Sequence, residues 1–291
     1  MIGLSGMKTS VTPGKMKPRR KRSILPGRRL SLGVTITMLS LIVLIPLFSV
    51  LLTLTGTSFT DFWKVVTDRQ TIATYKVSLM CASIAAVVNV VFGVILAWTL
   101  TRYRFPFRRI LDGLIELPFA LPTAVAGISL TTLYSDKGWL GGLFARIGVK
   151  ISYTRIGIII AMIFIGIPFV VRSIQPVLEK LDPQYEEAAR VLGASRTRTF
   201  FRVVFPEILP AALTGFGLAF ARSLGEYGSV VFIAGNIPYK TQITPLIIMN
   251  KLEQFNYSAA TSIALVMVVF AFILLFTINA IQAWINRVAR G

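Results

Sequence analysis

Histidine is absent from this sequence of 291 residues, and cysteine occurs once, as Cys81. A single cysteine excludes a disulfide within the chain, and without histidine a Cys/His metal site is excluded as well. The lack of histidine also removes the commonest general acid–base group of enzymes. Only 12 aspartates and glutamates are present, so we expect no covalent chemistry from this chain.

Nucleotide-binding and nucleophile motifs are missing too. The pair Gly14-Lys15 lacks the upstream glycine and the following Ser/Thr of a GxxxxGK[ST] phosphate loop, and there is no GxSxG elbow. The sequence therefore predicts no cofactor bound by this chain and no metal site. If its work consumes energy, a partner must supply that energy.

The composition is that of a polytopic membrane protein. Hydrophobic residues make up 54% of the chain and charged residues only 15%, whereas soluble domains have about a quarter of their residues charged. The net charge of +19 is compatible with nucleic-acid binding. However, the basic residues flank apolar segments, which is how membrane proteins set their orientation, so we expect no nucleic acid.

A basic tail and six long apolar segments organise the chain. We expect an all-α fold with a disordered cytoplasmic tail at 1–30 and a transmembrane domain at 31–291. The first segment is too long for a signal peptide, and Pro46 should kink it. The expected spans are 30–54, 76–101, 110–134, 156–178, 208–235 and 258–286.

Positive charge fixes the expected orientation of these spans. With six spans, 21 of the 31 lysines and arginines fall on the side that holds both termini and the loop at 179–207, and nine fall on the other side. The positive-inside rule therefore predicts that both termini and this loop are cytoplasmic.

The loop at 179–207 carries the signals of a short helix. Asp182 is a suitable N-cap, Pro183 suits the first helical position, and Gly193 predicts a left-handed stop. Ser195 should cap a second short helix that Pro206 ends. The first helix would have one apolar face, made of Tyr185, Ala188, Ala189 and Leu192. From these residues alone, the helix could lie on lipid headgroups or dock on a partner.

Charges inside the apolar segments form a second group. Arg222 and Glu226 stand near the middle of the expected fifth span, one helical turn apart. A charge at that depth costs several kcal/mol, about 2.5–3.5 on insertion scales. The two can pair with each other, and Arg222 can alternatively offer its donors to a passing anion. Asp112 and Glu116 begin the third span, where we expect interfacial pairs with the neighbouring Arg108 and Arg109.

The spacing within the loop resembles a known family signature. Glu187-Ala188-Ala189, three residues, Gly193, nine residues and Val203-x-Phe205-Pro206 resemble the EAA signature of bacterial ABC-importer permeases, in which the last element is I-x-L-P. The resemblance covers about 75–286. It implies that the helix docks on a separate cytoplasmic ATPase, with Tyr185, Glu187, Ala188, Ala189, Leu192, Gly193 and Pro206 as coupling residues.

A second resemblance concerns the cargo. The segment from Phe220 through Ile233-Ala234-Gly235-Asn236-Ile237-Pro238 and Lys240-Thr241 is similar to the sulfate and molybdate permease branch. Together with the extra N-terminal span and Phe276-Thr277-Ile278-Asn279, it resembles the T-type subunit of sulfate/thiosulfate importers. The pathway residues that this implies are Arg222, Ser223, Gly225, Glu226 and Gly228.

The resemblance also implies partners and a location. These are a sister permease subunit of the W type, two copies of an ATP-binding subunit that use ATP, and a periplasmic sulfate-binding protein. The complex would lie in the lipid bilayer of a bacterial inner membrane. A molybdate or tungstate importer remains an alternative cargo class. A stand-alone secondary transporter would predict inverted repeats, and we find no convincing internal repeat.

Overall fold

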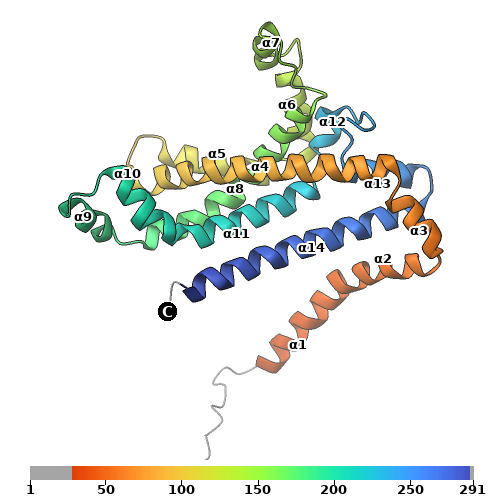
Figure 1. The fold of residues 1–291 in the computed structure, drawn as a ribbon, viewed down its shortest axis with the longest axis horizontal. Helices are drawn as coiled ribbons and strands as arrows, with labels where there is room; N and C mark the ends of the chain where they lie inside the picture. Colours follow the sequence, from red (N-terminus) through yellow and green to blue (C-terminus); the bar gives the residue numbers. More distant parts are fainter. Residues whose placement is uncertain (1–27, 289–291) are drawn as a thin grey trace, which may run out of the picture. The chain divides into compact units, whose positions relative to one another are not determined.

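The computed structural model describes Arg28–Val288 as a succession of helices (Figure 1). The predicted tail at 1–30 lies almost entirely outside these residues. The chain divides into two units, Met1–Ser49 and Val50–Gly291. The described part of the first unit consists of α1 (Arg28–Leu39), a π-helix (Ser40–Leu44) and the start of α2 (Ile45–Thr55). The π-helix ends just before Pro46, where the sequence predicts a kink.

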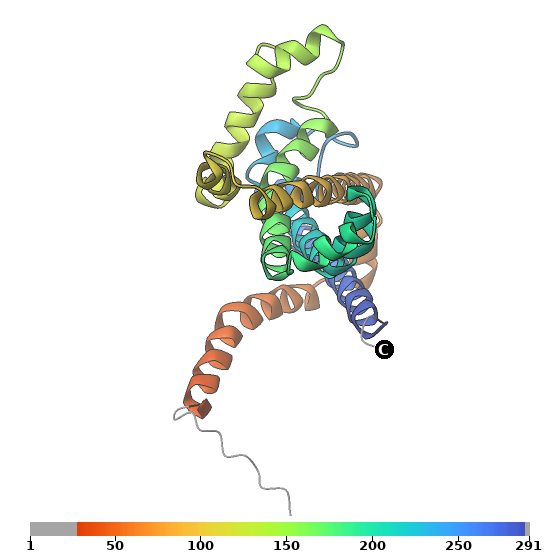
Figure 2. The ribbon, with the colours of Figure 1, turned by 90° about the vertical axis from the view of Figure 1, so that its left-hand side faces the viewer.

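Three long helices form the core of the second unit: α4 (Arg69–Arg102), α8 (Arg155–Lys180) and α11 (Phe205–Leu224). They pack side by side, and α14 (Tyr257–Val288) packs against α11 (Figures 1 and 2). The core is rich in small residues, and this lets the helices approach closely. A Cβ at Gly93 of α4 would overlap Val170 of α8, and one at Gly166 of α8 would overlap the Asn89 amide of α4.

The number of spans matches the sequence-based prediction. Among the described residues, five helical segments are long and apolar enough to cross a membrane, and a sixth span is obtained if one bent helix pair counts as a single span. The all-α fold and the multi-pass character are thereby confirmed. The bounds differ most in the fifth span, and the third span is interrupted within its predicted range.

The third span is not one continuous helix. It consists of α5 (Arg108–Ala120) and α6 (Thr123–Tyr134), which meet at an angle of 111°. Leu121 precedes Pro122 and has an extended backbone with ψ 135°. Proline disfavours the helical conformation in the residue before it and cannot donate a backbone hydrogen bond. The chain therefore turns at Leu121–Pro122.

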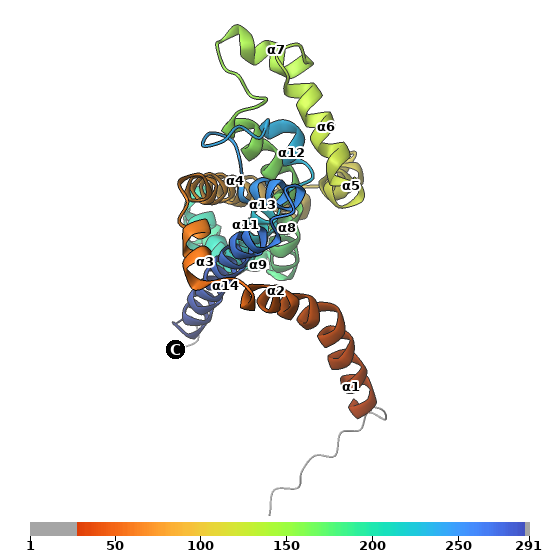
Figure 3. The same cartoon turned by 90° about the vertical axis from the view of Figure 1, so that its right-hand side faces the viewer.

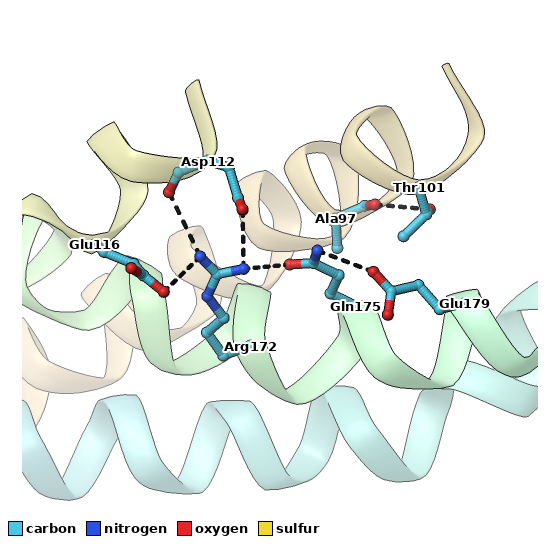
Figure 4. A network of polar contacts seen from close by, with 7 residues as sticks. All are labelled: Ala97, Thr101, Asp112, Glu116, Arg172, Gln175 and Glu179. Atoms are coloured by element: carbon cyan, nitrogen blue, oxygen red, sulfur yellow. Dashed lines mark hydrogen bonds and ion pairs between the residues drawn. The ribbon is translucent and has the colours of Figure 1, made fainter. Parts of the chain in front are cut away.

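An ion-pair network holds α5 against α8 (Figure 4). Arg172 Nη1 lies 2.8 Å from Asp112 Oδ1, and Arg172 Nη2 lies 2.6 Å from Glu116 Oε1. Gln175 accepts a hydrogen bond from Arg172 Nη1 at 2.6 Å and donates one to Glu179 Oε1 at 3.1 Å. The predicted pairing of Asp112 and Glu116 with Arg108 and Arg109 is therefore wrong, because both carboxylates turn toward the neighbouring helix.

The fifth span begins and ends earlier than predicted. It runs from Arg196 to Leu224 through α10 (Arg196–Thr199), a π-helix (Phe200–Val204) and α11. Ser195 caps α10 by accepting the Arg198 N–H at 3.3 Å, as predicted. Pro206 does not end this helix, contrary to the prediction. It lies in the first turn of α11, after the wide π turn, where no helical N–H is required of it.

Several short helices between the long ones were not predicted as separate elements. They are α3 (Phe59–Val66), α7 (Trp139–Arg146), α12 (Val230–Ala234) and α13 (Thr244–Glu253). The last two lie near the N-terminal end of α4 (Figures 1 and 3). Ser78 Oγ of α4 accepts the Thr244 N–H of α13 at 2.8 Å. The C-terminal end of α4 lies at the opposite end of the bundle, near α9 and α10.

Candidate functional site

The first candidate region is the α9 loop, residues 179–207, which contains α9 (Gln184–Val191). Asp182 Oδ1 accepts the Gln184 N–H at 3.0 Å and satisfies one of the unpaired donors of the first turn. Pro183 precedes the helix instead of opening it, one residue from its predicted place. Asp182 thus performs the capping predicted from the sequence.

The far end of α9 is fixed by a glycine stop. Gly193 has φ +79°, which confirms the predicted left-handed residue. Its N–H donates to Arg190 O at 2.9 Å, and Ala194 N–H donates to Ala189 O at 3.0 Å. These two bonds are the pair found in a Schellman motif. They define where the helix ends and the direction in which the chain leaves it.

The predicted apolar face of α9 is open to the surroundings. Tyr185 is 62% exposed and Leu192 is 88% exposed, while Ala188 is exposed and Ala189 half-buried. Val191, which the sequence-based face omitted, is 87% exposed. Glu187 and Gly193 are exposed on the same helix and its stop, and Pro206 is exposed at the start of α11. Exposed apolar side chains grouped on a short, well-capped helix favour a docking surface.

The opposite side of α9 is anchored to the bundle by a buried ion pair. Glu186 is buried, and its Oε1 lies 2.9 Å from Arg102 Nη2 at the C-terminal end of α4. The same Arg102 nitrogen donates to Leu181 O at 3.1 Å. The guanidinium also lies 5.8 Å from the centre of the Trp98 ring, within range of a cation–π contact. Movement of α9 is therefore coupled to the end of α4.

A cavity of about 490 Å³ lies beside this anchor. The residues that line it come from the end of α4, from α9, from α10 and from the following π-helix, and most of them are aromatic or basic. They are Trp98, Tyr103, Glu186, Arg190, Arg196, Thr197, Thr199, Phe200 and Phe201. Phe200 packs edge-on against Trp98, with ring centres 5.4 Å apart. The α9 loop is thus attached to the bundle through one ion pair and an aromatic contact.

The second candidate region is the Arg222–Gly228 turn, which follows the end of α11. Arg222 Nη1 lies 2.6 Å from Glu226 Oε2, which confirms that the two residues can pair. The sequence predicts that both residues lie near the middle of a helix. In the structure Arg222 lies in the last turn of α11, which ends at Leu224, and Glu226 lies beyond that end. Glu226 is 1% exposed, and its other oxygen accepts the N–H of Ser229 at 2.8 Å and its hydroxyl at 3.0 Å. One carboxylate thus neutralises Arg222 and caps the chain that leads into α12.

This turn lies against the break in the third span. A Cβ at Gly228 would overlap Thr123 Oγ1, at the start of α6, and one at Gly127 of α6 would overlap the Ser229 backbone. Two interrupted helices therefore meet here. Irregular backbone at membrane depth is tolerated where it is buried in protein or lines a cavity, and the pathway residues predicted from the sequence lie at this meeting point.

The other predicted pathway residues differ in exposure. Ser223 is buried, and its hydroxyl has no hydrogen-bond partner in the described part of the chain. Gly225 is exposed, and Arg222 keeps 34% of its side chain exposed. The turn and the α9 loop are separate regions, because residues 208–221 of α11 lie between them, about 21 Å at the rise of an α-helix.

Besides Val191, sequence reasoning gave no role to three residues of these regions. Nothing in the sequence pairs Arg102 with Glu186, which are 84 positions apart. Thr123 follows Pro122 in a segment that we expected to be continuous. Because a proline often marks a helix boundary, Pro122 could have indicated that a helix starts at Thr123. Nothing in the sequence indicates the contact between Thr123 and Gly228. The described residues contain no cluster of three His, Cys, Asp or Glu side chains that could hold a metal ion.

Comparison with known proteins gives two kinds of match. Residues 89–291 match the family model described as "Binding-protein-dependent transport system inner membrane component". The chain is 50% identical over 266 residues to the sulfate transport system permease protein CysT of Salmonella typhimurium, covering 91% of this chain and 96% of that protein. It is 46% identical over 256 residues to the protein of the same name from Synechocystis, covering 88% and 90%.

Solved structures of low sequence identity share the fold. A chain of a bacterial alginate ABC transporter, in complex with its pentasaccharide-bound periplasmic protein, superimposes with a TM-score of 0.74 at 18% identity. That match covers 87% of this chain and 93% of the other. A chain of the MetNI methionine ABC transporter in an inward-facing conformation gives 0.57 at 16% identity, covering 79% and 99%.

Proposed function

The chain belongs to the family of binding-protein-dependent transport system inner membrane components, and from this premise we propose that it is the T-type permease subunit of an ATP-driven sulfate and thiosulfate importer. It is a multi-pass membrane protein that forms part of a transport pathway and carries out no chemistry of its own. The printed names of its 50%-identical relatives support sulfate as the cargo.

The observation that carries the energy-coupling part of the proposal is the shape of α9. Tyr185, Val191 and Leu192 project from a helix that is capped at both ends and anchored on its other side by Glu186. Such a helix fits a groove on a cytoplasmic ATPase. The small side chains of Ala188 and Ala189 allow close backbone approach, and Gly193 sets the exit of the chain.

Movement of the docked helix has a direct route into the membrane. The Arg102–Glu186 pair joins α9 to α4, and the chain after Gly193 continues through α10 into α11. When two ATPase subunits close on ATP, two such helices would be drawn together. The long helices would then tilt and switch the pathway between outward- and inward-facing states.

The Arg222–Gly228 turn is the proposed pathway element of this chain. Arg222 is partly exposed and held by Glu226, and Gly225 and Gly228 let backbone approach without side chains in the way. An arginine fixed by one carboxylate oxygen still has donors left for a passing dianion. The remaining partners in this proposal are a W-type sister permease, two ATP-binding subunits and a periplasmic sulfate-binding protein, with both termini of this chain cytoplasmic.

Reconstitution tests the function. The chain, its sister permease, the ATPase and the binding protein are placed in liposomes, and uptake of radiolabelled sulfate is measured with ATP on the ATPase side. We expect ATP-dependent uptake that thiosulfate inhibits more strongly than molybdate. Uptake of molybdate in preference to sulfate would overturn the assigned cargo. Sulfate transport by this chain alone, without the ATPase, would overturn the coupled mechanism.

A further inference from the structure

A second cavity lies at the end of the bundle opposite to α9. Its volume is about 300 Å³, and it is lined by Ala73, Lys76, Val77, Met80, Arg155 and Tyr239. Four of these residues come from the first turns of α4, and Arg155 opens α8. Lys76 and Arg102 are both on α4 and 26 residues apart, about 39 Å along the helix. The Lys76–Arg155 pocket is therefore far from α9, which lies near the other end of α4 (Figure 1).

The charge of the Lys76–Arg155 pocket is not neutralised by the chain. Two cations line it and no carboxylate does. Within the described residues, neither Lys76 nor Arg155 takes part in an ion pair. Arg155 Nε donates to Lys240 O at 2.9 Å, which holds the guanidinium in place and leaves its other N–H groups without a partner in the described structure. Two unpaired positive charges in one small recess favour a doubly negative ligand.

One wall of the pocket is a preorganised loop. Tyr239 has φ +62° and Asn236 has φ +48°, a conformation that costs energy in a bulky residue such as tyrosine and clusters at functional sites. The N–H groups of Lys240, Thr241 and Gln242 all donate to Ile237 O, at 3.0–3.2 Å. Thr241 Oγ1 accepts the Ile237 N–H at 3.1 Å. Tyr239 is thus presented at the pocket by a closed turn.

The same loop is fastened to the start of α4. Gln242 donates to Asn236 Oδ1 at 2.9 Å and accepts from Gln70 Nε2 at 2.7 Å. The backbone segments that carry the cations and the phenol are therefore linked to one another, and the Arg155 guanidinium is held by Lys240 O. Preorganisation of this kind favours binding because less conformational entropy is lost.

We propose that the Lys76–Arg155 pocket is an outer binding site for the transported tetrahedral oxyanion, which the anion occupies before it reaches the Arg222–Gly228 turn. The inference rests on the proposed function and adds a substrate site to it. Lys76 and Arg155 supply the charge, and Tyr239 can donate a hydrogen bond. Val77 is buried and adds an apolar side to the pocket. A cavity of about 300 Å³ has room for a tetrahedral oxyanion together with bound water.

The test measures sulfate binding to the assembled complex in a phosphate-free detergent, with the binding protein left out. We expect wild type to bind radiolabelled sulfate, and Lys76→Gln with Arg155→Gln to weaken binding at least tenfold. Arg155→Lys, which keeps the charge, should retain most of the affinity. The control is Lys64→Gln with Lys251→Gln, because neither residue lines the pocket; this pair should bind like wild type.

Three outcomes overturn the inference and leave the proposed function standing, provided that the wild-type complex imports sulfate. The first is equal sulfate affinity in the wild type and the double variant. The second is a pocket that binds only phospholipid, shown by phosphatidylglycerol that binds to the wild type and the control but not to the double variant, while none of the three binds sulfate. The third is a double variant that loses affinity for the binding protein alone. A wild-type complex that imports no sulfate would instead contradict the proposed function.

Discussion

Arg102 Nη2 lies 2.9 Å from Glu186 Oε1 and ties the last residue of α4 to the buried side of α9. The two side chains are only 17% and 10% exposed. The pair orients α9 so that Tyr185 and Leu192 face away from the bundle. It also links α9 directly to α4, so in the proposed function it would transmit movement of a docked ATPase to a long apolar helix.

Glu186→Gln should loosen α9 without unfolding the protein. A hydrogen bond to a charged group contributes about 1.5–3 kcal/mol, so the amides of α9 should exchange with deuterium roughly ten- to a hundredfold faster. Hydrogen exchange measured by mass spectrometry checks this. Asp136→Asn is the control, because it breaks an ion pair with Lys150 that is more than half exposed. If α9 exchanges as slowly in Glu186→Gln as in wild type, the anchoring role is wrong.

Gly228→Ala should damage the meeting point of the two interrupted spans. Its new Cβ would overlap Thr123 Oγ1, and overpacking a tight contact costs about 1–3 kcal/mol. We expect a lower melting temperature of the complex and reduced sulfate uptake. Gly225→Ala is the matched control for stability, since the nearest atom to its new Cβ would be Ala221 O at 4.0 Å. Equal melting temperatures of the two variants would contradict the close approach of Gly228 to α6.

Arg172→Met should destabilise the attachment of α5 to α8. It leaves Asp112 and Glu116 one helical turn apart on α5 without their cation. The carboxylates are 39% and 55% exposed, so we expect a modest loss of about 1 kcal/mol, measured as a lower melting temperature.

A compensating variant separates charge from packing in this network. Arg172→Met combined with Asp112→Asn and Glu116→Gln removes the repulsion between the two carboxylates and should recover at least half of the lost stability. If the triple variant is no more stable than Arg172→Met, the guanidinium acts through its packing and not through its charge.

Local signals in the sequence predicted the local structure well. Asp182, Gly193 and Ser195 have the predicted capping roles. A cap depends on the residue's own backbone conformation and on contacts with residues a few positions away, so the local sequence is enough to predict it. The apolar length of each span likewise depends only on its own residues. The two main errors concern Pro122 and Leu224, where helices end inside apolar segments. A hydropathy profile does not detect such breaks, because a broken apolar helix and a continuous one have the same composition.

Partners distant in the sequence could not be predicted. Arg172 lies 60 residues from Asp112, and Glu186 is joined to an arginine in another span. Arg108 and Arg109 are nearer to Asp112 and Glu116 in the sequence than Arg172 is. Proximity in sequence therefore favoured the wrong ion pairs for these two carboxylates. Only the packing of α5, α8 and α9 against the bundle decides these partners.

The most direct test of the account is co-purification of the ATPase with a Leu192→Lys variant, together with ATP-driven sulfate uptake. Leu192 is 88% exposed, so the change should leave the fold intact, and a cation suits the C-terminal end of a helix. Ile147→Lys is the control, since Ile147 is 71% exposed and lies outside the α9 loop.

We predict that Leu192→Lys loses ATPase binding and sulfate uptake at least tenfold, because the new charge would be buried without a partner in an apolar contact. Ile147→Lys should retain both the bound ATPase and the uptake. Wild-type levels of bound ATPase and of uptake in Leu192→Lys would contradict the assignment of α9 as the docking helix.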